Sequence, residues 1–166
     1  FLHGMGDNAS YDISSMKLRF PGRLLVIPQH WRSNTSIKHL IEERSIGADV
    51  LTDEDITYLK QLNHEKDSIL RSEIFLLWMI GYYERLTGQN VDIVAHSLGA
   101  KIALNLFAHS EDALQSRLLN DGFPAQWADN RHKIRSLDLG GVPFRTVLSV
   151  SAFEYYLYRL TMMSFS

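Results

Sequence analysis

The residues around Ser97 constrain the fold of this chain more than any other part of the sequence. Residues 91–94 form a short apolar run rich in β-branched side chains, which predicts a buried strand. Residues 101–107 carry apolar side chains at helical spacing, which predicts a helix. The residues between the two runs include small Ala95 and Gly99, placed two before and two after Ser97. The chain therefore has to turn sharply from strand into helix at Ser97.

Such a turn can make a serine reactive. A serine hydroxyl becomes a useful nucleophile when its backbone holds it where a histidine can reach Oγ and where a helix N-terminus can receive negative charge. The turn leaves room only for small neighbours, which Ala95 and Gly99 provide. The alternative is that Ser97 acts as an ordinary helix N-cap. Because a cap needs neither small neighbour, the pattern favours a nucleophile.

A glycine-rich turn at the start of the chain predicts the second half of a catalytic site. Phe1 and Leu2 have the character of a strand end, and His3-Gly4-Met5-Gly6-Asp7 follows them. In acyl transfer the carbonyl oxygen becomes anionic and is stabilised by two backbone N–H groups. The two donors would be the N–H of Leu98, directly after the serine, and the N–H of Met5.

These two motifs resemble those of the α/β-hydrolase superfamily, in its lipase, esterase and thioesterase branches. Residues 95–99 are similar to the alanine-first motif of small bacterial lipases, and residues 3–7 are similar to the opening of palmitoyl-protein thioesterases. The resemblance implies a serine hydrolase that cleaves a carboxylic ester or thioester through an acyl-serine intermediate on Ser97, with Met5 and Leu98 holding the oxyanion. No cofactor is implied.

The rest of the chain predicts alternating strands and helices. A strand is expected over residues 23–28, a long helix over residues 68–86 and a further strand over residues 144–150, and Thr52 is expected to cap a helix. This alternation predicts a single α/β domain over residues 1–166, with a mostly parallel sheet and helices on both faces. Ligands of such sheets bind beyond the carboxyl ends of the strands, where both motifs lie.

No motif after Ser97 identifies the catalytic acid and histidine that such a hydrolase needs. Hydrolases of this type carry them in the order serine, acid, histidine, on loops after later strands. We expect both groups beyond Ser166, and the chain to be an internal fragment of an α/β-hydrolase-like domain. The alternative uses His132 as the base with Asp121, Asp129 or Asp138 as its acid, although residues 120–132 have the composition of a polar surface loop.

Composition and residue spacing limit the kinds of molecule that this chain is expected to bind. A formal net charge of −2, without a basic stripe, argues against a nucleic-acid partner. No apolar run is long enough for a transmembrane helix, and the histidine spacing predicts no metal site. The expected partner is a small-molecule or lipid-like acyl ester. Two alternatives stay open: an inactive hydrolase-like module that binds a partner, and an amidase or peptidase on the same fold.

Overall fold

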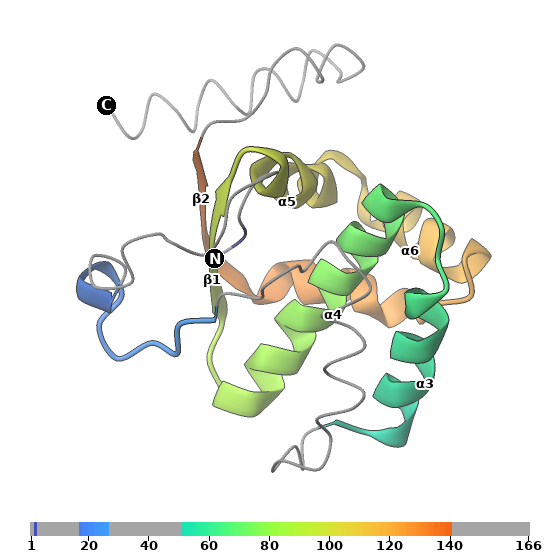
Figure 1. The fold of residues 1–166 in the computed structure, drawn as a ribbon, viewed down its shortest axis with the longest axis horizontal. Coiled ribbons are helices and arrows are strands. Elements are labelled where there is room, and N and C mark those ends of the chain that lie inside the picture. Colours follow the sequence, from blue (N-terminus) through green and yellow to red (C-terminus); the bar gives the residue numbers. More distant parts are fainter. Residues whose placement is uncertain (1, 3–16, 27–50, 141–166) are drawn as a thin grey trace.

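The computed structural model describes Leu2, residues 17–26 and residues 51–140 of the chain. Its elements, in chain order, are helix α3 (Asp53–Asn63), helix α4 (Ser68–Thr87), strand β1 (Val91–His96), helix α5 (Leu98–Ala108), helix α6 (Glu111–Asn120), the 3-10 helix η2 (Ala125–Lys133) and strand β2 (Ile134–Gly140) (Figure 1). This part of the chain is therefore α/β, as expected, and most of it is helical.

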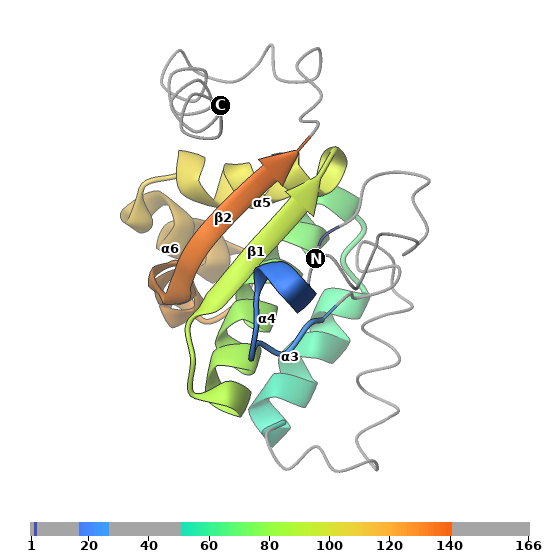
Figure 2. The same ribbon diagram turned by 90° about the vertical axis from the view of Figure 1, so that its left-hand side faces the viewer.

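The two strands lie side by side and run parallel (Figure 2). Val91 pairs with Ile134 at the start of the ladder, and His96 pairs with Gly140 at its end. On the other edge of β1, Leu2 forms a parallel bridge with Ala95. The parallel pairing predicted from the sequence is confirmed for these segments.

The sheet separates two layers of the molecule. Helices α3 to α6 lie on one side of it, and residues 17–26 lie on the other (Figure 1). On that second side, the described residues are helical only at positions 17–19. Alternate residues of β1 face the helices, which is why Ile93 and Ala95 are buried, whereas Asp92 and Val94 are only partly covered.

Helix α4 supplies the centre of the core. It begins where Asp67 accepts hydrogen bonds from the N–H groups of Ile69 and Leu70, and it ends at Gly88 in the left-handed conformation, with φ of 64°. Every residue from 72 to 82 is buried. A helix that is apolar on all sides must be covered on all sides. The predicted helix over residues 68–86 is confirmed.

A buried carboxylate joins α3 to α4. Thr52 caps α3 in a capping box with Asp55, as its sequence predicts, and the Asp55 side chain is 7% exposed. Trp78 Nε1 donates to Asp55 Oδ1 at 2.8 Å, and Arg85 Nη2 donates to Oδ2 at 2.9 Å. Burial raises the pKa of Asp55, but hydrogen bonds from Thr52 and Trp78 and the charge of Arg85 outweigh it, so that the pKa lies below 3.8.

Three expectations about the later chain and the early strand need correction. The strand that follows the α5 helix along the chain is β2, and not residues 144–150, which lie outside the described residues. Residues 120–132 are not a surface loop, because they include the end of α6 and most of η2, with Trp127 and Ala128 buried. Residues 23–26 have no strand assignment.

Candidate functional site

Ser97 lies between the last residue of β1 and the first residue of α5, with φ of 53° and ψ of −124°. Among the described residues it is the only one other than glycine with a positive φ. These angles match the first central position of a type II′ turn, which glycine dominates because it has no Cβ. A serine held there stores strain of about 1–3 kcal/mol, and such strain gathers at active sites.

The Ser97 side chain does not cap the helix that it precedes. Ser110 offers a direct comparison, because it precedes α6 with φ of −63° and its Oγ accepts a hydrogen bond from the Ala113 N–H. Ser110 is thus an ordinary N-cap, whereas Ser97 has the strained backbone and no capping bond. The structure therefore does not support the interpretation of Ser97 as a cap.

Neighbouring backbone holds Ser97 in place. Its N–H donates to the carbonyl of Gly140, the last residue of β2, at 2.9 Å, and its own carbonyl accepts from the Lys101 N–H at 3.1 Å. Ala95 is 1% exposed and Gly99 is buried, so both small residues on either side of Ser97 lie inside the protein. Sheet and helix together fix the turn.

The expected oxyanion donors are only partly visible. Leu98 is the first residue of α5, so its N–H has no acceptor within the helix and lies at the positive end of the helix dipole. Met5 lies outside the described residues. The N-terminal turn of α5 thus presents at least one N–H suited to an anionic oxygen beside Ser97.

The internal base suggested by the sequence lies far from Ser97. His132 precedes Ile134, which pairs with Val91 at the opposite end of β1, about 20 Å from Ser97 at 3.3 Å per residue. Its ring lies 3.0 Å from a carboxylate oxygen of Glu111 on an exposed surface. A general base has to reach Oγ through a hydrogen bond or one water, so His132 cannot act on Ser97 in this arrangement.

The three candidate acids lie on different elements. Asp121 follows α6, where its carbonyl accepts a hydrogen bond from Gln61, and Asp129 is exposed within η2. Asp138 lies on β2 and pairs with Arg19 Nη2 at 2.5 Å. The described residues therefore supply a strained serine and a helix N-terminus beside it, and His132 does not lie within reach of that serine.

Sequence reasoning missed a polar cluster on the opposite half of β1. The Asp92 carboxylate is 8% exposed and contacts Arg23 Nε at 3.1 Å, Arg135 Nη2 at 2.6 Å and Ser136 Oγ at 2.5 Å. Burial raises the pKa of Asp92. The hydrogen bonds from Arg135 and Ser136 and the charges of Arg135 and Arg23 have a larger, opposite effect, so that the pKa lies below 3.8. A lone charged residue in an apolar strand is the signal that could have indicated these partners.

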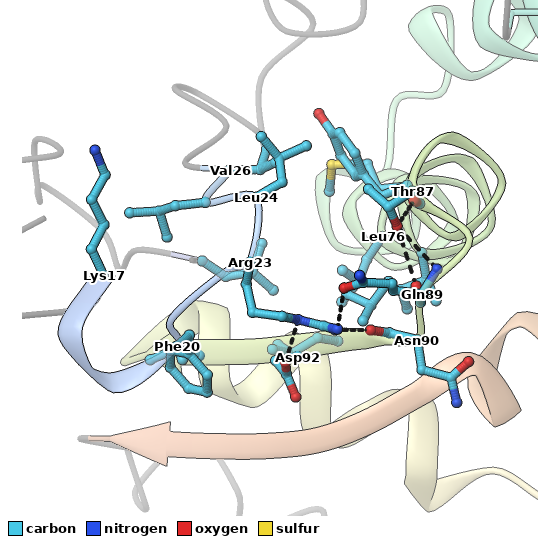
Figure 3. Close-up of a pocket in the computed structure, with 18 residues that line it drawn as sticks. Lys17, Phe20, Arg23, Leu24, Val26, Leu76, Thr87, Gln89, Asn90 and Asp92 are labelled. Atoms are coloured by element: carbon cyan, nitrogen blue, oxygen red, sulfur yellow. Dashed lines mark hydrogen bonds and ion pairs between the residues drawn. The ribbon is translucent and has the colours of Figure 1, made fainter.

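An open cavity of about 130 Å³ lies beside this cluster (Figure 3). Residues 91–94 of β1 line it together with side chains of α4 and of residues 17–26. It follows the early half of β1, whereas Ser97 lies beyond the end of that strand. The cavity is therefore separate from the serine.

Metal ligands and membrane-spanning helices can be assessed for residues 17–26 and 51–140. No group of three histidine, aspartate or glutamate side chains there is placed to hold a metal ion. No helix in this part of the chain is long and apolar enough to span a membrane.

Comparisons with protein-family models, with curated proteins and with solved structures find no match for this chain.

Proposed function

We propose that this chain belongs to a serine hydrolase of the α/β-hydrolase fold that cleaves carboxylic esters or thioesters through an acyl-Ser97 intermediate. The observation that carries the proposal is the conformation of Ser97 at the junction of β1 and α5. Its backbone is strained, and its side chain makes no capping hydrogen bond. The parallel arrangement of Leu2, β1 and β2 supports the fold, because it puts Ser97 at the carboxyl end of the strands.

The chemistry divides into two acyl transfers. Ser97 Oγ loses its proton to a histidine and attacks the acyl carbonyl carbon, forming a tetrahedral intermediate. The N–H groups of Leu98 and Met5 stabilise its oxyanion, and each donor contributes about 2.7–4 kcal/mol to the barrier reduction. The histidine returns the proton to the departing alcohol or thiol. Water then repeats the attack on the acyl-enzyme and releases the acid.

The histidine and its acid come from outside the described residues in this proposal. The distance of His132 from the serine excludes it from the role, and its ring contacts Glu111.

Covalent labelling by a fluorophosphonate probe tests the proposal. An adduct found by intact mass on the folded chain should be a single one and should be lost in Ser97→Ala, which would place a working base within residues 1–166. Ser110→Ala is the matched control, because it removes a serine hydroxyl from the other serine-led helix and should leave the adduct in place. Labelling that survives Ser97→Ala would contradict the proposal. A folded chain that is not labelled would mean that the base lies outside residues 1–166 or is absent, as in the inactive binding module.

A further inference from the structure

Strand β2 has one more residue than its pairing with β1 requires. At the start of the ladder, Val91 pairs with Ile134. The next residue of β1, Asp92, pairs with Ser136, so the ladder advances by one residue on β1 and by two on β2. Arg135 therefore has no partner on β1, and β2 has a β-bulge at this position. Beyond the bulge the pairing is regular to the ends of both strands.

The bulge keeps the apolar side chains of β2 on one face. Ile134, Leu137 and Leu139 all pack against the helical core, although the first two are three residues apart. In an unbroken strand, residues an odd number apart point to opposite faces. The extra residue corrects this phase, and it leaves Arg135 and Ser136 together on the outer face, where both are exposed.

The Asp92 carboxylate binds both outer-face residues of the bulge. Arg135 Nε and Nη2 donate to its two oxygens at 2.9 and 2.6 Å, and Ser136 Oγ donates to Oδ1 at 2.5 Å. Arg23 Nε pairs with the same carboxylate at 3.1 Å, and the Arg23 guanidinium donates to the Asn90 carbonyl (Figure 3). We call Asp92, Arg135 and Ser136 the bulge clamp. Because the carboxylate is 8% exposed, its hydrogen bonds are stronger than those of an open surface pair.

The apolar pattern alone does not select the observed register. If β2 slipped by two residues, its apolar side chains would still face the core, because side chains alternate with a period of two. The slip would bring a different carbonyl to the Ser97 N–H, which in the observed register donates to Gly140 at 2.9 Å. The bulge clamp distinguishes these registers, because Asp92 lies directly opposite Ser136 only in the observed one.

We propose that Asp92 and Arg135 are positioning residues for Ser97, because the bulge clamp selects the register in which the Gly140 carbonyl holds the strained Ser97 backbone. Asp92 lies five residues before Ser97, so both residues act through the alignment of the two strands. The inference rests on the proposed function only in taking Ser97 as the nucleophile.

Nuclear magnetic resonance of the isotope-labelled chain measures this contact. A scalar coupling across the hydrogen bond identifies the Gly140 carbonyl as the acceptor of the Ser97 N–H, and amide exchange reports how often the bond opens. In Asp92→Ala we expect the coupling to be lost. The Ser97 amide should exchange at least about tenfold faster relative to the amide of buried Leu77 in α4, because charge-assisted hydrogen bonds that hold the bulge are removed. Asp92→Asn keeps one oxygen acceptor and should raise this ratio less.

Asp138→Ala is the matched control. It removes another outer-face carboxylate, which pairs with Arg19 and lies two residues before Gly140, closer to the contact than Asp92 does. Because this pair lies outside the bulge clamp, the exchange ratio should change by less than about twofold. An equal effect of Asp138→Ala and Asp92→Ala would overturn the proposal, since any loss of an ion pair on this face would then suffice.

Arg135→Ala tests the other half of the bulge clamp. It should act like Asp92→Ala, and the double variant should exchange no faster than either single variant. These variants and Asp92→Asn keep the test decisive if Asp92→Ala does not fold. An unchanged coupling and exchange ratio in the Asp92 variants and in Arg135→Ala would overturn the proposal. Fluorophosphonate labelling is a separate measurement, so failure of the hydrolase proposal is seen independently of failure of this one.

Discussion

Replacing Ser97 by glycine should make the protein more stable while it removes the proposed nucleophile. The strain at φ of 53° and ψ of −124° is worth about 1–3 kcal/mol, and glycine relieves it. Glycine also gives the unfolded chain more freedom, which costs about 0.5–1 kcal/mol. The net expectation is a gain of about 1 kcal/mol in the free energy of unfolding, since no capping bond is lost.

Urea unfolding of four variants measures this gain. Ser97→Ala should change stability by less than about 0.5 kcal/mol, because alanine keeps the strain and no cap is removed. At Ser110, whose Oγ caps α6, alanine should lower stability by about 1 kcal/mol and glycine by a few tenths. Ser110→Gly is expected to be less stable than the unsubstituted chain. If Ser97→Gly were also less stable than the unsubstituted chain, the strain argument would be refuted.

Two further substitutions probe the helical layer. Asp55→Ala should lower the free energy of unfolding by about 3 kcal/mol at pH 7, because Trp78 and Arg85 lose a buried acceptor. Because the folded pKa of Asp55 lies below 3.8, its contribution to the free energy of unfolding is present above about pH 4 and is lost as the pH falls through the folded pKa. The difference in stability between Asp55→Ala and the unsubstituted chain should therefore be smaller at pH 3 than at pH 7. Gly81→Ala should destabilise by about 2 kcal/mol despite better helix propensity, because the added Cβ would lie 2.5 Å from Asn130 Nδ2, which donates to the Leu77 carbonyl. Adding Asn130→Ala tests the clash, since the double variant should lose less than the sum, and strictly additive losses would contradict it.

Local signals in the sequence predicted the elements whose causes are local. Helix α4 was predicted over residues 68–86 and is observed as Ser68–Thr87, with Asp67 and Gly88 as its caps. The same holds for Thr52 at the start of α3, and for β1, which is short, apolar and bounded by turn residues. At the candidate site, Ala95 and Gly99 predicted a strand-to-helix turn at Ser97, and the structure has that turn, with Leu98 as the first residue of α5.

Strand β2 was missed because its stability comes from elsewhere in the chain. Its outer face carries Arg135, Ser136 and Asp138, which do not look like strand residues when read alone. Arg135 and Ser136 bond to Asp92 on β1, and Asp138 pairs with Arg19. Helix η2 was missed for a similar reason, because its Asn130 is satisfied by the Leu77 carbonyl of α4. Partners more than forty residues away leave no periodicity to read.

The hydrogen bond from the Ser97 N–H to the Gly140 carbonyl makes the geometry at Ser97 depend on the register of the two strands. Asp92 sits opposite Ser136 immediately after a shift in the ladder, and its bonds fix which residue of β2 faces which residue of β1. Ser97 lies five residues after Asp92, directly past the end of β1. The same register brings the Gly140 carbonyl to the Ser97 N–H. A slip by one residue would put a different carbonyl at the turn and reverse the faces of β2. The ion-pair cluster around Asp92, about 16 Å from Ser97, thus helps to fix the strand register on which the backbone contact of Ser97 depends.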